Sequence, residues 1–281
     1  MGGGFIKRRY LKALVIYGMA ATLLTVCGFP LLFMVMTTLK PDGEIISATP
    51  TLFTSNPHLE HYYRLFATTK FLTYFRNSIV VAGSATLLCV TVATLAGYGI
   101  TRFRFRGREG IAGIMLFTYM FAPIMIIVPF FILMRGYGLQ NSHLGLVLAY
   151  TTFALPFSMW LLRSFFQSIP IELEQAAMTD GASRPQAVLY VIVPLALPGI
   201  IAVSIFSFIV AWNDYIFTRV LITSNELKTL PVGISDLVNA TLIDWGMILA
   251  GGVVITIPAL LFFIMIQRYL ISGWGAGAVK G

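Results

Sequence analysis

The sequence predicts an all-α integral membrane protein with six transmembrane helices. Composition is the first observation behind this prediction: 58% of the 281 residues are hydrophobic and only 11% are charged, with a mean hydropathy of +0.85. About a quarter of the residues in a soluble domain are charged. The second observation is a series of uncharged runs, each long enough to cross a hydrocarbon core that requires about 20 helical residues.

The first apolar run follows three basic residues, Lys7 to Arg9, an arrangement that also occurs at the start of a signal peptide. The apolar core of a signal peptide has only about 7 to 15 residues, whereas this run is longer and lacks a clear A-x-A cleavage site. We therefore expect an uncleaved first helix. One membrane domain is predicted over residues 1–281, with spans at about 11–39, 75–101, 111–134, 144–166, 191–213 and 245–270.

The distribution of basic residues predicts which loops face the cytoplasm. With the N-terminus inside, 12 of the 19 Lys and Arg residues fall in inner segments. The sharpest asymmetry is the short loop RFRFRGRE, residues 102–109, whose four arginines favour a cytoplasmic position because cytoplasmic loops are enriched in Lys and Arg. Both termini are therefore expected inside. Membrane orientation also accounts for the net charge of +8 without a nucleic-acid partner.

Two loops, about 40–76 and 214–244, are expected on the outer side. Each loop is shorter than the roughly 40 residues that a domain without disulfides or metals requires for its own core. Each loop must therefore fold on the spans or on partners. His58 and His61 in the first loop are spaced i, i+3, but two ligands without a third are weak evidence for zinc. No metal site is predicted.

A polar segment, residues 169–190, interrupts the apolar runs. A charge at the centre of a membrane helix costs about 2.5 to 3.5 kcal/mol on insertion scales. We therefore expect the segment to lie in water, because it carries four charged residues: Glu172, Glu174, Asp180 and Arg184.

Residues 170–179 of this segment predict a short helix. Pro170 and the acids that follow suit a helix N-terminus, where a missing N–H is harmless and carboxylates favour the dipole. Ala176 and Ala177 leave a smooth face on which another surface can pack closely. Gly181 permits positive φ and is expected to end the helix in a turn.

This segment resembles the EAA motif of the membrane subunits of binding-protein-dependent ABC importers, in which E-A-A precedes D-G-A and an L-P…P ending. Gln175 stands where that family usually has the glutamate, and Glu174 keeps a carboxylate one residue earlier, about 100° around the helix. By the resemblance, the segment couples the chain to an ATPase. The residues to which this coupling role is carried over are Glu174, Gln175, Ala176, Ala177, Asp180, Gly181 and Ala182.

The resemblance covers nearly the whole chain and is strongest to the maltose-type carbohydrate uptake branch. Matching runs include LKPDGEI, AGYGITRFRFRGRE, AWNDYIF, TLPVGI and the ending QRYLISGWGAGAVKG, with Gly275 where the family usually has threonine. The implied fold is the type I, MetI-like ABC importer permease, with a cytoplasmic coupling helix. In that branch the tail, here 271–281, reaches between the ATPase subunits, which implies contacts from Gly277, Ala278, Val279 and Lys280.

The chain lacks a G-x-x-x-x-G-K-[ST] phosphate loop, so it is expected to be a transport subunit rather than an enzyme, with no cofactor of its own. ATP and Mg are expected on a separate cytoplasmic ATPase dimer. The resemblance further implies a second homologous permease, an extracytoplasmic sugar-binding protein and a place in the cytoplasmic, or inner, membrane.

Three residues at the outer end of the fifth span, Trp212, Asn213 and Asp214, are candidates for a sugar path or gate. An interfacial Trp anchor beside a solvated Asp explains them equally well. The alternative function is a secondary transporter or channel without an ATPase, although the spans lack the carboxylate or histidine relay of proton coupling. A membrane enzyme comes third, since no catalytic set is recognisable.

The topology can be tested by cysteine labelling. We expect Arg106 and Arg184 to be cytoplasmic and Glu60 and Lys228 to be external, because of the arginine-rich loop. Each position is changed to cysteine in a cysteine-free background and exposed to a membrane-impermeant thiol reagent. Labelling of intact cells at position 106 but not at 228 would contradict the orientation.

Overall fold

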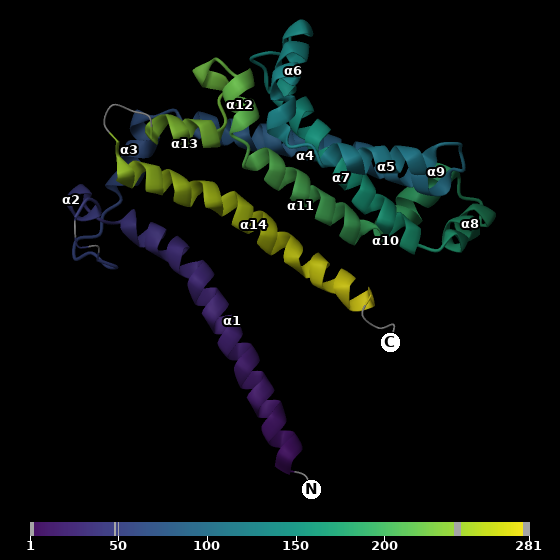
Figure 1. Ribbon diagram of the computed structural model, residues 1–281, viewed down its shortest axis with the longest axis horizontal. Coiled ribbons are helices and arrows are strands. Elements are labelled where there is room, and N and C mark those ends of the chain that lie inside the picture. Colours follow the sequence, from purple (N-terminus) through teal and green to yellow (C-terminus); the bar gives the residue numbers. More distant parts are fainter. Residues whose placement is uncertain (1–2, 48, 50, 239–242, 278–281) are drawn as a thin grey trace. The chain divides into compact units, whose positions relative to one another are not determined.

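The computed structural model describes residues 3–47, 49, 51–238 and 243–277. These residues form helices joined by loops, and none of them lies in a strand (Figure 1). Contacts between Cα atoms divide the chain into two compact units, one of residues 1–69 and 236–257 and the other of residues 70–235 and 258–281. Each unit is discontinuous in sequence, a division that the hydropathy pattern does not reveal.

The first unit contains α1 (Gly3–Thr37), α2 (Asp42–Ile45), α3 (Glu60–Thr68) and the first part of α14 (Trp245–Gly277). Apolar side chains along α1 stay exposed, and Leu24 retains 77% of its accessible surface. Exposed apolar surface suits a helix that faces lipid, because hydrocarbon solvates leucine as well as another helix does.

The core of the second unit consists of α4 (Phe71–Arg102), α7 (His143–Ser168) and α11 (Leu197–Trp212), which pack against one another. Small residues form the contacts. Gly97 of α4 lies where an added Cβ would stand 3.3 Å from Cβ of Leu162, and Gly199 of α11 lies against the ring of Phe165. Such residues let helix backbones approach closely in a membrane, where packing rather than the hydrophobic effect drives association.

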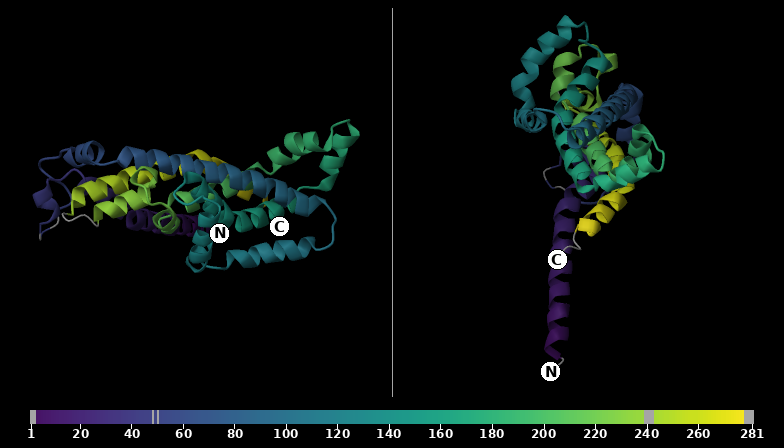
Figure 2. Two further views of the ribbon diagram at one scale, coloured as in Figure 1. Left: turned by 90° about the horizontal axis from the view of Figure 1, so that it is seen from above. Right: turned by 90° about the vertical axis from the view of Figure 1, so that its right-hand side faces the viewer.

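Two predicted spans, 111–134 and 191–213, are bent rather than continuous. α5 (Arg108–Tyr119) and α6 (Pro123–Gly136) meet at 102°, and the run from Arg184 to Leu195 meets α11 at 75°. The bend between α5 and α6 is visible in Figure 2. Proline explains both breaks, because it lacks an N–H and disfavours helix in the residue before it. Four helices are long and apolar enough to cross a membrane, and the predicted six are reached if each bent pair is one span.

Short helices occupy the ends of the second unit. They are α8 (Ile171–Thr179), α9 (Arg184–Ala187), a π-helical turn (Val188–Ile192), α10 (Val193–Leu195), α12 (Ile216–Leu221), a 3-10 turn (Asn225–Leu227) and α13 (Leu230–Val238). The helix expected over 170–179 is present as α8.

Two polar residues near the start of α4 hold the segment that precedes α13. The Asn77 amide donates hydrogen bonds to the carbonyl oxygens of Glu226 (2.7 Å) and Lys228 (3.0 Å). The neighbouring Ser78 hydroxyl accepts a 2.8 Å hydrogen bond from the backbone N–H of Leu230. Asn77 and Ser78 are both buried, so these bonds replace water that the groups would otherwise require.

Asn77→Leu is expected to loosen the segment of residues 222–229, because it removes two hydrogen bonds to carbonyl oxygens of that segment at a cost of about 1 to 3 kcal/mol. Limited proteolysis of the purified protein measures the effect as faster cleavage in that segment. Asn213→Leu is the control, since the Asn213 side chain is exposed. Equal cleavage rates in the two variants would show that Asn77 does not hold the segment.

Candidate functional site

The candidate site is the helix–turn–helix formed by α8 and α9, which lies at the same end of the bundle as the end of α7 (Figure 1). Pro170 precedes α8 with an extended backbone (ψ 133°), and the first turn contains Glu172 and Glu174. Both features fit the N-terminal rules from which the helix was predicted, because acids favour the positive end of the dipole.

The turn after α8 depends on Gly181, whose φ is +95°. The N–H of Ala182 donates to the carbonyl of Ala177 (3.0 Å) and the N–H of Gly181 to that of Met178 (3.2 Å), which satisfies carbonyls that a helix end leaves open. Side chains other than glycine rarely adopt this backbone conformation. The glycine predicted from the sequence therefore shapes the turn.

A capping box then starts α9. The Gln186 side-chain oxygen accepts hydrogen bonds of 2.8 Å from both the backbone N–H and the hydroxyl of Ser183. The two short helices are thus held by local hydrogen bonds on both sides of the turn.

Most of α8 is exposed, including the acidic Glu172 in its first turn. Ile171 and Leu173 retain 43% and 44% of their accessible surface, and Gln175 and Ala176 are also exposed. Ala177 is half-buried. Small and apolar side chains on an exposed helix face permit close packing of another surface, and this arrangement agrees with the sequence interpretation of the alanine pair.

Glu174 lies on the opposite side of α8 and is only 2% exposed. Its carboxylate accepts a 2.6 Å hydrogen bond from the Tyr98 hydroxyl. It also forms ion pairs with Arg102, where Nε lies 3.2 Å from Oε2, and with Arg184, where Nη1 lies 3.4 Å from Oε1. One buried carboxylate is therefore surrounded by a hydroxyl and two guanidinium groups from α4 and α9.

The Glu174 carboxylate is buried inside its own chain, and Gln175 is the residue that reaches the surface. The coupling role of both residues toward an ATPase stays a prediction. Helical spacing carried a signal that the sequence interpretation missed: Glu174, Ala177 and Met178 are spaced i, i+3, i+4, and all three are wholly or partly buried. A carboxylate on that face requires a buried cationic partner, which the sequence alone does not identify.

The three residues predicted for a sugar path have different environments. Trp212 is 2% exposed and its ring stacks on Phe208, with centroids 5.4 Å apart. Asp214 caps α12: its Oδ2 accepts hydrogen bonds from the N–H groups of Phe217 (3.0 Å) and Thr218 (3.2 Å). Burial raises the pKa of Asp214 above its ordinary value. Trp212 thus packs inside the unit, Asp214 caps a helix, and Asn213 is the exposed member of the three. Their role in a sugar path stays a prediction.

The helix break between α5 and α6 borders a cavity of about 400 Å³ within the second unit. Five of its thirteen lining residues are aromatic, among them Tyr119, Phe153 and Phe206, and Thr152 is one of its polar residues. The Thr152 hydroxyl donates to the carbonyl of Leu148 (2.7 Å). Non-helical backbone at membrane depth is tolerated where it lines a cavity or is covered by protein.

The predicted tail contact falls at the edge of the described chain. Gly277 is the last residue of α14, and Ala278, Val279 and Lys280 lie outside the described residues. Their contact with an ATPase stays a prediction.

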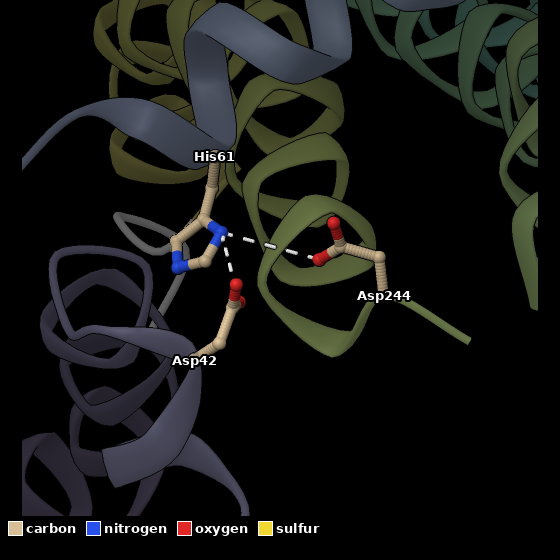
Figure 3. A group of neighbouring side chains, drawn as sticks. All are labelled: Asp42, His61 and Asp244. Carbon is tan, nitrogen blue, oxygen red and sulfur yellow. Dashed lines mark ion pairs between the residues drawn. The ribbon is translucent and has the colours of Figure 1, made fainter. Parts of the chain in front are cut away.

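In the first unit, Asp42, His61 and Asp244 bring three possible metal ligands together (Figure 3). Nδ1 of His61 lies 3.7 Å from Asp42 Oδ1 and 3.9 Å from Asp244 Oδ1. The Arg64 guanidinium lies 2.9 Å from the same nitrogen, 3.0 Å from Asp42 Oδ2 and 2.8 Å from Asp244 Oδ2. Arg64 supplies the positive charge among these groups, so the cluster is an ionic junction within the unit. His58, the sequence's second zinc candidate, is not one of the three.

Residues 89–274 match the family model described as "Binding-protein-dependent transport system inner membrane component". The chain is 36% identical over 277 residues to "Inner membrane ABC transporter permease protein YcjP" of Escherichia coli (strain K12), covering 98% of this chain and 99% of the relative. It is 32% identical to "Trehalose/maltose transport system permease protein MalG" of Thermococcus litoralis, covering 98% and 100%. It is 36% identical to "Diacetylchitobiose uptake system permease protein DasC" of Streptomyces coelicolor, covering 90% and 92%.

Among solved structures, the fold matches a chain of a bacterial ABC transporter involved in the import of the acidic polysaccharide alginate, with a TM-score of 0.81 over 92% of this chain and 96% of that chain. A second structure, the bacterial alginate ABC transporter in complex with an alginate pentasaccharide-bound periplasmic protein, matches with a TM-score of 0.68 over 94% and 95%. The identities are 22% and 16%, so these matches establish the fold.

Proposed function

Because the chain belongs to the family of binding-protein-dependent transport system inner membrane components, we propose that it is the permease subunit through which an ABC importer carries a sugar across the cytoplasmic membrane. The observation that carries the proposal within the structure is the exposed face of α8, held in place by the turn at Gly181. A separate ATPase would dock on this face and move it.

The proposed substrate is a mono-, di- or oligosaccharide. Support comes from relatives named for trehalose and maltose and for diacetylchitobiose, which match the chain over 90% or more of its length. The aromatic cavity at the α5–α6 elbow is the part of the described chain best suited to a passing sugar, because rings such as Tyr119 and Phe206 can stack on the C–H faces of a pyranose.

The proposed partners are a second, homologous permease, a cytoplasmic ATPase dimer and an extracytoplasmic sugar-binding protein. The ATPase would bind ATP and Mg, since this sequence has no phosphate loop. Both termini and α8 would lie in the cytoplasm, as the arginine-rich loop at residues 102–109 favours. ATP-driven closure of the dimer would then displace α8 and switch the cavity between inward and outward access.

On the exposed face of α8, Gln175 is proposed to replace the usual family glutamate as a neutral hydrogen-bonding group. An amide can both donate and accept, so the contact would lose charge but keep hydrogen bonding. Ala176 beside it would allow the ATPase surface to approach closely. The tail residues 278–280 are proposed to add a second contact with the same ATPase.

The function is tested by expressing the chain with its neighbouring permease, ATPase and binding-protein genes. The purified chain alone is expected to hydrolyse no ATP, whereas the complex is expected to hydrolyse ATP faster when sugar and binding protein are present, because the ATP site belongs to another subunit. Sustained turnover by the chain alone, free of contaminating ATPases, would rule out the proposal.

Ala176→Trp is expected to abolish co-purification of the ATPase and uptake of radiolabelled sugar, because an indole on the exposed face of α8 would hold the two surfaces apart. Tyr190→Trp is the matched control, since Tyr190 is 77% exposed but lies outside α8. Both variants are expected to insert normally. Full uptake by Ala176→Trp would show that this face does not dock the ATPase.

A further inference from the structure

The buried carboxylate of Glu174 connects α8 to the core of its unit. Arg102, the last residue of α4, pairs with this carboxylate through Nε and donates from Nη2 to the carbonyl of Ile169 (2.9 Å), which caps α7. One guanidinium therefore holds the ends of α4 and α7 and the middle of α8. In the part of the chain that the structure describes, every side-chain hydrogen bond or ion pair from α8 to α4 involves Glu174.

The burial of this pair makes the connection stiff. Glu174 is 2% exposed and the Arg102 side chain is 7% exposed, so little water is available to replace either partner of this pair. Removing one partner of a buried pair leaves the other charge buried and poorly compensated. By contrast, Glu109 in the ion pair with Arg163 is 64% exposed, and exposed pairs contribute little because water solvates the charges.

Aromatic packing holds Tyr98, whose hydroxyl donates to the Glu174 carboxylate, in place. The Tyr98 ring meets Phe103 and Phe166 edge-on, with centroids 6.0 and 6.1 Å apart. The Arg184 guanidinium of α9 lies over the Phe103 ring at 5.4 Å. The carboxylate thus has its donors on rigid supports, which leaves little freedom for α8 to move independently of α4.

We propose that Glu174 is a positioning residue that transmits the displacement of α8 to α4 and α7, and so links ATP hydrolysis to opening of the transport path. The inference rests on the proposed function, in which the ATPase docks on the opposite, exposed face of α8. Gln175 and Ala176 bind the ATPase, and Glu174 passes the movement inward. A flexible connection would let α8 follow the ATPase while the spans stay still.

The test measures sugar transported per ATP hydrolysed in proteoliposomes that contain the complete complex. Glu174→Gln is expected to leave the ATPase bound and hydrolysing ATP while the transport ratio falls about 5-fold or more, the lower end of typical coupling between distant sites. Tyr98→Phe keeps the ring packing but removes one hydrogen bond, and is expected to lower the ratio less. Glu109→Gln is the control and is expected to retain the wild-type ratio, because its ion pair is exposed.

A wild-type ratio in Glu174→Gln would overturn the inference. If the Glu174→Gln complex does not assemble, the Tyr98→Phe variant provides the test. A wild-type ratio of sugar transported to ATP hydrolysed in Tyr98→Phe would then overturn the inference. Failure of the wild-type chain to bind an ATPase at all would instead refute the proposed function.

Discussion

The structure depends on the cost of leaving a polar group unpaired away from water. In hydrocarbon each unsatisfied backbone group costs several kcal/mol, so long helices, which pair their own backbone, are the means by which this chain can cross a membrane. The same cost explains why proline breaks occur beside a cavity or at helix ends. It also explains why the wholly or partly buried polar side chains of the second unit, such as Asn77, Asp214 and Glu174, each have partners at hydrogen-bonding distance.

These polar residues gather at the ends of helices and have different structural roles. Asn77 and Ser78 hold a connecting segment to α4, and Asp214 caps α12. Glu174 differs because its partners include charged groups from two other helices. An ionised pair in a poorly solvated place contributes little net stability compared with apolar packing, but it strongly restricts geometry. A mechanical link between a docking helix and the spans benefits from such restriction.

The two sides of α8 have different roles in the proposed coupling site. The exposed side includes the small Ala176 and the uncharged Gln175 beside the acidic Glu172, and these side chains are available to another protein. The buried face carries the single carboxylate that connects the helix to α4. Because a helix turns by about 100° per residue, the neighbouring residues Glu174 and Gln175 point in different directions, Glu174 into the chain and Gln175 toward the surface. The family resemblance led us to treat them as alternatives for one contact, whereas the structure separates them.

Local chemistry in the sequence was enough to predict the membrane class, the positions of the apolar helices, and the helix and turn around Gly181. Apolar length, proline, glycine and the short EAA-like motif each act over a few residues, so no distant contact is needed to interpret them. Only the tertiary structure decided that Glu174 is buried beside Tyr98 and Arg102, because those partners lie more than 70 residues away along the chain. The same reason applies to the capping role of Asp214 and to the junction around Arg64: side-chain pairing across helices depends on how the helices pack, which periodicity within one helix does not encode.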